Sequence, residues 1–155
     1  MSSSALLASE YLMRLAAEFD EPQTIENGPH GTRRILYMTG GSFDGAKLSG
    51  AVMPRGADWV TARPDGVFQL DIRLTLRADD GALIYVSSSG LFDIEPGKLG
   101  RLRRGEPMAA SEYYFRTTLM FETGALRYGW PNRILAVGIG TRTPTGMSTE
   151  VFALT

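Results

Sequence analysis

Residues 67–78 read Val67-Phe68-Gln69-Leu70-Asp71-Ile72-Arg73-Leu74-Thr75-Leu76-Arg77-Ala78. The even-numbered residues are all apolar, whereas the odd-numbered residues from Gln69 to Arg77 are polar or charged. Successive side chains of a β-strand point to opposite faces, so this period of two predicts one long strand with an apolar and a polar face.

Glycine-containing turns flank this strand on both sides. Asp65-Gly66 precedes it and Asp80-Gly81 follows it. Asp-Gly between alternating segments is typical of a type I′ hairpin turn, in which both central residues have positive φ. The next segment, residues 82–91, also alternates, and we expect it to run antiparallel to the first.

Further short strand patterns follow one another along the chain, separated by turns rich in glycine, which occurs 18 times. This organisation predicts antiparallel strands in an all-β barrel or sandwich. Gly138 and Gly140 lie inside one predicted strand, where glycine often marks a bend or a close approach of the backbone. The further predicted strands cover residues 33–38, 46–53, 58–61, 112–123, 133–142 and 149–154.

Two segments have helical features. Residues 96–104 follow acidic residues, end in basic ones and carry Leu99 and Leu102 three apart, which fits a short helix with a complemented dipole. Residues 4–19 space their leucines near helical intervals, so propensity favours a helix there, with a strand over residues 11–18 as the alternative.

The composition is that of an ordinary globular protein. Of 155 residues, 43% are hydrophobic and 21% are charged, and 16 basic against 17 acidic residues give a net charge of -1. Nucleic-acid binding needs a basic excess, so we expect no nucleic-acid partner. Neither a signal-peptide pattern nor an apolar run of about 20 residues is present, so we expect a cytoplasmic protein without a membrane segment.

Few residue types remain to carry chemistry. Cysteine is absent, which excludes disulfides, thiolate nucleophiles and cysteine–zinc sites. His30, the single histidine, lies among turn-forming residues and is interpreted as a solvated loop residue. Asp79-Asp80-Gly81 is interpreted as a turn, and we expect no metal and no cofactor. Catalysis would then depend on carboxylates, tyrosines, arginines or backbone groups.

Seven blocks of sequence, in the same order, resemble the family catalogued as DUF 3237, a bacterial and fungal domain of unknown function. The resemblance covers nearly the whole chain after about Tyr11. It departs from the usual pattern at Pro131, where the usual member has leucine. The blocks are Gly41-Ser42-Phe43-Asp44-Gly45, Gly56-Ala57-Asp58-Trp59, Leu70-Asp71-Ile72-Arg73, Asp79-Asp80-Gly81-Ala82-Leu83-Ile84-Tyr85, Tyr113-Tyr114-Phe115-Arg116-Thr117, Phe121-Glu122-Thr123-Gly124 and Tyr128-Gly129-Trp130-Pro131-Asn132-Arg133.

The resemblance implies a lipocalin-like, closed antiparallel β-barrel with one short helix, often associated as a dimer. It also favours the strand over residues 11–18, which leaves residues 1–10 as an N-terminal tail before a single barrel domain over residues 11–155. Where the family has a suggested role, that role is cofactor-free lyase chemistry on aromatic compounds, including release of formaldehyde from lignin-derived biaryls. We therefore expect a small aromatic substrate and a homodimer.

Two strand faces carry candidate catalytic groups. Asp71 and Arg73 share the polar face of the first strand, and Arg116 and Glu122 share a face of a second predicted strand. In a ligand-holding barrel such faces can line the interior, where buried charges need partners. The alternative is a solvated outer face. On the interior interpretation Asp71 or Glu122 is the base, Arg73 and Arg116 stabilise negative charge, and Tyr85 binds a hydroxyl or moves a proton.

The candidate substrate-binding residues are mostly aromatic. Tryptophan and tyrosine more often fill a core or an interface, but in a cavity they stack on an aromatic ligand. In that arrangement the two tryptophans flank a ring and Asn132 holds a substrate hydroxyl. The full set is Asp58, Trp59, Tyr114, Tyr128, Trp130 and Asn132.

Three functions fit these residues. The first is a cofactor-independent lyase that cleaves a carbon–carbon bond of a lignin-derived biaryl-type substrate and releases formaldehyde by acid–base catalysis. The second is a non-catalytic, lipocalin-like binder of a hydrophobic small molecule. The third is a cyclase, isomerase or hydratase of secondary metabolism.

Overall fold

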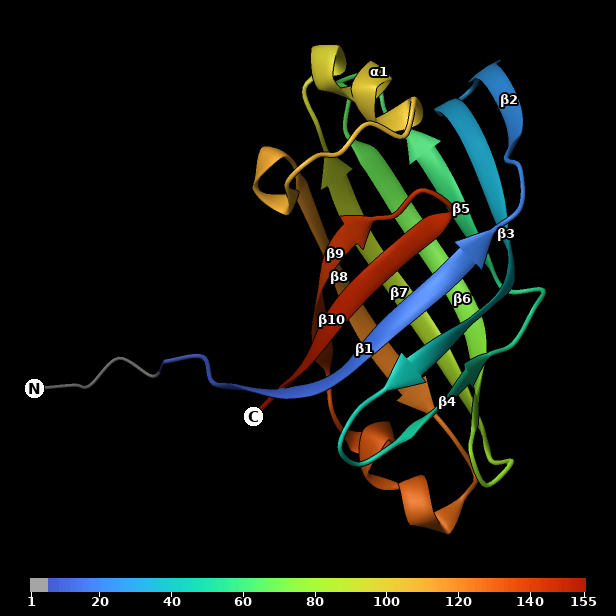
Figure 1. Ribbon diagram of the computed structural model, residues 1–155, viewed down its shortest axis with the longest axis vertical. Coiled ribbons are helices and arrows are strands. Elements are labelled where there is room, and N and C mark those ends of the chain that lie inside the picture. Colours follow the sequence, from blue (N-terminus) through green and yellow to red (C-terminus); the bar gives the residue numbers. More distant parts are fainter. Residues whose placement is uncertain (1–5) are drawn as a thin grey trace, which may run out of the picture.

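Ten antiparallel strands form one continuous sheet that curls until its first strand pairs with its third. Figure 1 shows the resulting barrel in a computed structural model, which describes residues 6–155. The strands are β1 (Ser9–Phe19), β2 (Gln23–Gly28), β3 (Gly31–Asp44), β4 (Ser49–Val52), β5 (Ala57–Ala62), β6 (Phe68–Ala78), β7 (Leu83–Asp93), β8 (Tyr114–Glu122), β9 (Ala136–Arg142) and β10 (Gly146–Leu154).

The barrel closes through β1, which pairs with β10 on one side and with β3 on the other. Between β3 and β6, β4 and β5 follow one another in a single position, so the closed barrel has 8 strand positions. β2 pairs with β3 and extends the sheet beside the upper end of the barrel in Figure 1. The all-β, closed antiparallel barrel predicted from the sequence is confirmed.

Short helices lie at both ends of the barrel. α1 (Pro96–Arg103) and the 3-10 turn η1 (Ala110–Glu112) lie at the upper end in Figure 1, and η2 (Leu126–Tyr128) and η3 (Trp130–Arg133) lie at the lower end. α1 begins with proline and ends in basic residues, as the sequence predicted. Within residues 6–155, no helix combines the length and the apolar character needed to cross a membrane.

The alternating segment forms β6, and the barrel encloses its apolar face. Leu70, Ile72, Leu74 and Leu76 are each at most 6% exposed, whereas the charged residues between them are exposed. Burial of one such aliphatic side chain contributes roughly 1.5–3 kcal/mol, so a row of them fixes which face of the strand points inward.

The end of the barrel far from α1 is a packed core. β7 leads toward α1, so Ile84 at its start and Leu76 opposite it lie at the far end. Phe43 belongs to the same end, because it pairs with Gly50, which pairs with Ala78. Ile84, Leu76 and Phe43 are each at most 2% exposed, as expected for closely packed side chains.

The two Asp-Gly turns join the predicted strands, but their geometry differs from the predicted type I′ turn. Among the residues of these two turns, the aspartates have negative φ, and only the glycines, Gly66 and Gly81, have positive φ, which is 90° in each case. The Gly81 N–H donates a 2.8 Å hydrogen bond to the Ala78 carbonyl, which is the bond of a type I turn followed by a glycine bulge. This three-residue loop requires the left-handed conformation of glycine alone, which glycine adopts without steric cost.

Residues 9–19 form the strand β1, so the helix that propensity favoured is wrong and the strand alternative holds. Pairing on both edges and burial of Leu12, Met13 and Leu15 outweigh the small propensity difference. β1 begins at Ser9, inside the predicted tail of residues 1–10, of which residues 1–5 lie outside the described residues. β2 was not predicted from the sequence, because its exposed side chains show no apolar alternation.

Gly140 of β9 makes the close approach that the sequence predicted. A Cβ atom at Gly140 would lie 2.4 Å from the ring of Phe115 on the neighbouring strand β8, so a larger residue would displace that ring. Phe115 is 3% exposed and packs in the barrel interior. Gly140 thereby positions an aromatic ring of the cavity described next.

Candidate functional site

A cavity lies at the α1 end of the barrel, and its empty space, including the part that is open to solvent, is about 620 Å³. Its wall combines phenyl rings and aliphatic side chains with a few charged groups. This mixture of apolar walls and a few charged groups is typical of sites that bind small organic molecules. The lining residues are Phe19, Arg34, Leu36, Asp58, Val60, Phe68, Leu70, Phe92, Leu99, Leu102, Arg103, Phe115, Arg142 and Met147.

Asp58 supplies the carboxyl group of this cavity and is 5% exposed. It lies in β5, directly opposite Ile72 of β6. Asp58 Oδ1 accepts a 3.1 Å hydrogen bond from the backbone N–H of Asp71, so the side chain takes up a donor of the neighbouring strand. The other carboxyl oxygen forms no hydrogen bond with another residue of the described chain, which leaves it available to a ligand.

Burial raises the pKa of Asp58 to about 7, because its carboxylate loses hydration inside the barrel. The hydrogen bond from the Asp71 N–H and the positive charge of Arg142 oppose this rise in pKa, and the negative charge of Asp71 adds to it. A carboxyl group with a pKa near neutrality can both accept and return a proton. Asp58 therefore has the property that a general acid–base catalyst needs.

Three guanidinium groups reach the cavity from three different elements. Arg34 belongs to β3, Arg103 is the last residue of α1 and Arg142 is the last residue of β9. Across residues 6–155, no carboxylate lies within ion-pair distance of any of the three. No three histidine or acidic side chains of the described chain gather as they would around a metal ion. The charged part of the cavity thus consists of three cations and one carboxyl group.

The pKa values of the arginines reflect this arrangement. Burial lowers the pKa of Arg34, and the positive charges of Arg103 and Arg142 lower it further. Burial also lowers the pKa of Arg142, although Asp58 and Tyr113 counteract this decrease. Arg142 is nevertheless exposed at the end of β9 and also lines the cavity, so a ligand can contact its guanidinium group. Arginine keeps its proton in proteins, so the cavity has a positive potential.

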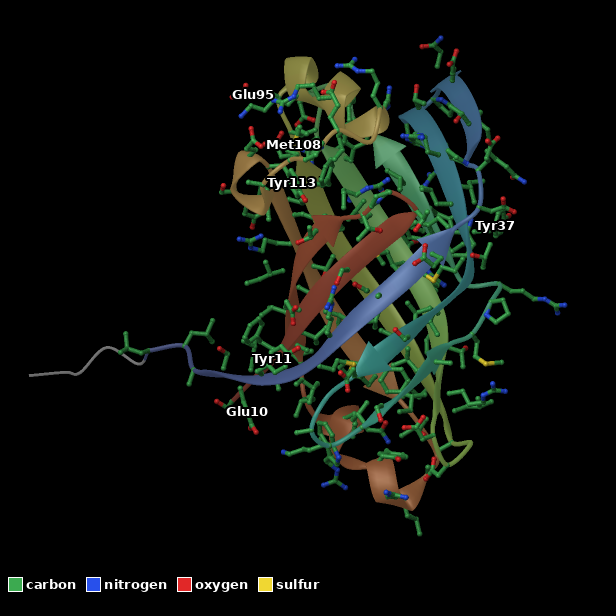
Figure 2. All side chains as sticks on the ribbon, viewed as in Figure 1. Glu10, Tyr11, Tyr37, Glu95, Met108 and Tyr113 are labelled. Carbon is green, nitrogen blue, oxygen red and sulfur yellow. The ribbon has the colours of Figure 1, made fainter. Side chains whose placement is uncertain are left out.

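Aromatic side chains form one wall of the site. The centre of the Phe92 ring lies 5.9 Å from that of Phe68, 5.3 Å from that of Phe115 and 5.2 Å from that of Tyr113. Tyr113, labelled near the α1 end of the barrel in Figure 2, is 8% exposed. Its hydroxyl oxygen accepts a 3.0 Å hydrogen bond from the backbone N–H of Arg142, which ties the end of β9 to this aromatic wall.

Comparison with known proteins identifies the family. The family model described as "Protein of unknown function (DUF3237)" matches residues 7–154. The chain belongs to the DUF3237 family. The resemblance inferred from the seven sequence blocks is therefore confirmed. One curated relative, the UPF0311 protein RPA1785 of Rhodopseudomonas palustris, is 35% identical over 136 residues, which cover 88% of this chain and 89% of the relative.

Solved structures share the barrel over the whole of this DUF3237 chain. The crystal structure of RPA1785 has a TM-score of 0.91 and 31% identity, and the alignment covers 99% of this chain and 100% of that one. A β-barrel-like protein from Acinetobacter baumannii AYE has a TM-score of 0.85 and 30% identity, with 100% of both chains covered. An enzyme from Penicillium herquei has a TM-score of 0.76 and 18% identity over 100% of this chain and 99% of that one, which establishes a common fold alone.

The predicted catalytic residues of β6 lie on the outside of this DUF3237 barrel. Asp71 and Arg73 point away from the cavity because the neighbouring Leu70 and Ile72 point inward. Asp71 and Arg73 form a 3.4 Å ion pair in which their side chains are 52% and 59% exposed. Such an exposed pair contributes about 0–1 kcal/mol. The interior interpretation of this strand face is wrong, and the solvated alternative is correct.

The other predicted catalytic residues also lie on the outer face of the DUF3237 barrel. Tyr85 of β7 and Glu122 of β8 are exposed and face each other in the ladder between these strands. Arg116 donates a 2.9 Å hydrogen bond to the Phe115 carbonyl, and its guanidinium carbon lies 5.3 Å from the centre of the Tyr114 ring. The barrel wall separates all of these side chains from the cavity.

Only one predicted substrate-binding residue, Asp58, lines the cavity. Trp59, next to it in β5, is half-buried on the opposite face of the strand, because neighbouring side chains alternate. Tyr114 is exposed on the outer face of β8. The local sequence thus identified the right segment of β5 but could not say which of two adjacent residues points inward.

Three further predicted binding residues belong to the end of the DUF3237 barrel far from the cavity. Tyr128 is buried in η2, and Trp130 is half-buried in η3 with the Lys47 Nζ 5.2 Å from the centre of its ring. Asn132 is exposed, and its side chain forms hydrogen bonds of 2.8 and 2.9 Å with the backbone N–H and carbonyl of Thr123. These residues stabilise the connection between β8 and β9.

Sequence reasoning did not single out Arg34, Arg103 or Arg142. Two of them could have been recognised from the strand pattern. Arg34 lies on the same strand face as the buried Leu36, and Arg142 lies on the same strand face as the buried Ala136. A charged residue in register with buried ones is a candidate for a cavity. Arg103 was considered only as one of the basic residues that end the predicted helix over residues 96–104, and the position of α1 at the barrel mouth brings it into the DUF3237 site.

Proposed function

We propose that this protein is a cofactor-independent acid–base enzyme that acts on a small aromatic substrate inside the barrel. The observation that carries the proposal is the buried Asp58, whose pKa of about 7 is set within a cavity that also contains Arg142 and a wall of phenyl rings. Burial of a carboxyl group is unfavourable, and a site that only bound an apolar molecule would gain nothing from it.

As a lyase, the protein would cleave the bond between a side-chain carbon and a terminal carbon that carries a primary hydroxyl. Asp58 takes the hydroxyl proton, and the C–O bond becomes the C=O bond of formaldehyde while the carbon–carbon bond breaks. The electron pair of that bond moves to the carbon next to the ring system, where the Arg142 guanidinium, beside Asp58, stabilises the negative charge. Protonated Asp58 then returns the proton to this carbon, so the reaction consumes no oxidant and no reductant.

The same groups also serve a cyclase or isomerase. Asp58 takes the proton of a substrate hydroxyl, the oxygen adds to an activated double bond of the same molecule, and Asp58 returns the proton to the other carbon. Both reactions require one proton-transfer group and a cationic site for developing negative charge. The family resemblance in the sequence blocks is the reason for testing carbon–carbon cleavage of lignin-derived biaryls first.

Incubation of the purified, chelator-treated protein with a panel of lignin-type diaryl compounds that carry a primary hydroxyl tests this proposal. We expect at least one compound to release formaldehyde at a rate proportional to the protein concentration. An isomeric product without formaldehyde, detected by chromatography, would assign the protein to the cyclase class instead. Saturable binding of these compounds without any product would contradict the enzymatic proposal and support the non-catalytic binder.

We also propose that the protein is a homodimer joined through the outer face of β7, β8 and β9. On this face Leu91 and Ile139 lie on either side of Arg116 and are each 39% exposed, and Met120 is 58% exposed. Exposed apolar side chains gathered on one sheet face are typical of an interface. Light scattering at micromolar concentration should give twice the monomer mass, and Met120→Glu should reduce it to the monomer mass. A monomeric native protein would contradict the proposal.

A further inference from the structure

The cavity contains more positive charge than the carboxylates of the described residues neutralise. At the α1 end of the barrel, Arg101 pairs with Glu106 and Glu112, and Arg104 pairs with Glu106. Arg103, between them in sequence, turns toward the cavity and has no carboxylate within ion-pair distance among residues 6–155. The neighbouring arginines are therefore neutralised by the protein, whereas the cavity arginines are not.

The positions of the cavity arginines divide the site into two parts. Arg34 and Arg103, together with Phe68, also line a second pocket beside β2, to which Glu26 contributes a carboxylate. Arg142 acts on Asp58, since each alters the pKa of the other. Arg34 and Arg103 thus form a cationic pair at the mouth, and Asp58 and Arg142 form a second group, with phenyl rings lining the same cavity.

Like charges held together in a partly buried site repel one another. Arg34 has Arg103 and Arg142 close enough to disfavour its charged form, and burial removes part of its hydration. Asp58 cannot compensate all three, because it is a single carboxyl group that is only partly ionised near neutral pH. An anionic group of a ligand would relieve this repulsion and take up the free guanidinium donors.

We propose that the cavity binds an aromatic carboxylate, with its carboxylate held by Arg34 and Arg103 at the mouth and its ring against the phenyl wall. This inference rests on the proposed function and narrows its substrate class. A guanidinium group matches a carboxylate in shape and can donate two parallel hydrogen bonds to it. A small inorganic anion would use the charges but not the rings Phe68 and Phe92. The carboxylate end would keep the other end of the substrate near Asp58.

Titration calorimetry of the native protein with three probes tests the substrate class. Benzoate carries ring and charge, benzamide carries the ring with a neutral group of the same shape, and inorganic phosphate carries charge alone. We expect benzoate to bind at least about tenfold more tightly than benzamide, as charge-assisted hydrogen bonds are stronger than neutral ones. Benzoate should also bind more tightly than phosphate, and its affinity should fall as the salt concentration rises.

Two substitutions locate the carboxylate. Arg34→Gln and Arg103→Gln should each weaken benzoate binding by about tenfold and leave benzamide binding unchanged. Arg104→Gln is the matched control, because this arginine follows Arg103 directly but pairs with Glu106 outside the cavity. Arg103 is exposed at a helix end, so its replacement leaves the core intact.

The outcomes separate this inference from the proposed reaction. Equal affinity for benzoate and benzamide would overturn it, and so would phosphate that binds as tightly as benzoate. Benzoate selectivity that depends on Arg34 and Arg103, without turnover of any compound, would support the aromatic-carboxylate site and contradict the enzymatic proposal. Turnover of uncharged diaryl compounds by a protein that does not prefer benzoate would support the enzyme and overturn this inference.

Discussion

Replacement of Asp58 by asparagine should lower kcat by about a hundred- to ten-thousandfold, the range that a positioned general acid–base group contributes. Asparagine has the same shape and still offers an oxygen to the Asp71 N–H, which Asp58 Oδ1 accepts at 3.1 Å. The cavity should therefore keep its form and its affinity, while proton transfer is lost. Steady-state kinetics on a compound that the protein turns over measure this effect, with KM expected to change little.

The control for this experiment is Glu122→Gln. Glu122 is a carboxylate that the sequence suggested as the base, but it is exposed on the outer face of β8. We expect this variant to retain its full turnover number. If Glu122→Gln were inactive and Asp58→Asn fully active, the assignment of the reaction to the cavity would be wrong.

The pH dependence of the native enzyme supplies a second measurement for the same residue. As the base, Asp58 must lose its proton before substrate is converted, and its pKa is about 7. The rate constant kcat/KM should therefore rise with pH through a midpoint near this value. The remaining activity of Asp58→Asn should lack this midpoint, and an unchanged pH profile in the variant would show that another group titrates.

The second large effect concerns stability, because Asp58→Asn should make the folded protein more stable above neutral pH. In the unfolded chain aspartate titrates at its ordinary pKa of 3.8, whereas the folded protein holds the Asp58 proton up to about pH 7. Between these two values the folded state binds a proton that the unfolded state releases. The contribution of Asp58 to the free energy of unfolding is therefore complete at low pH and is lost as the pH rises.

The size of this effect follows from the distance between the two pKa values. Each pH unit between them corresponds to ~1.4 kcal/mol, which gives roughly 4 kcal/mol from 3.8 to about 7. Asparagine is neutral at every pH and avoids the loss. Asp58→Asn and the native protein should have similar free energies of unfolding near pH 4, and the variant should be more stable by up to this amount near pH 8.

Urea denaturation of both proteins across this pH range measures the difference. The comparison between variant and native protein is essential, because other carboxyl groups titrate as well. Asp65, for example, has its pKa lowered by its hydrogen bond with Arg63, so its own contribution changes with pH in the opposite direction. A variant that is equally or less stable than the native protein near pH 8 would contradict the buried, charge-sensitive state of Asp58.

Together the two effects distinguish a functional group from a structural one. Replacement of a residue that serves only stability should make the protein less stable. Asp58→Asn, in contrast, is expected to make the protein more stable and less active. Such a combination is characteristic of active-site residues that are unfavourable for folding. It also makes the kinetic result easy to interpret, since an inactive variant that is more stable than the native protein has not lost activity by unfolding.

Much of the fold was predictable because it depends on local patterns. Alternation over residues 67–78 predicted β6, and Asp80-Gly81 predicted the hairpin to β7, although not its type I turn with a glycine bulge. β1 was ambiguous, because its leucines fit a helix until pairing with β10 and β3 is considered. The intrinsic propensity of a segment does not reflect long-range pairing of this kind.

The candidate site was predictable only in part. Asp58 was identified, but as a neighbour of Trp59 and not as the central acid. Asp71, Arg73, Arg116 and Glu122 were grouped correctly by strand face and then assigned to the wrong side of the wall. Alternation along a strand shows which side chains share a face. It does not show whether that face points into the barrel or out to solvent.

The sequence by itself determined that the chain forms alternating antiparallel strands of an all-β barrel or sandwich, because side-chain alternation and glycine turns are local properties of the backbone. Only the tertiary structure decided which face is the interior, since enclosing the apolar rows of all strands at once is a property of the closed sheet. The fold also brings Arg34, Asp58, Arg103 and Arg142 to one cavity from four different elements. Their convergence depends on strand order and on the position of α1, neither of which is encoded in any one segment.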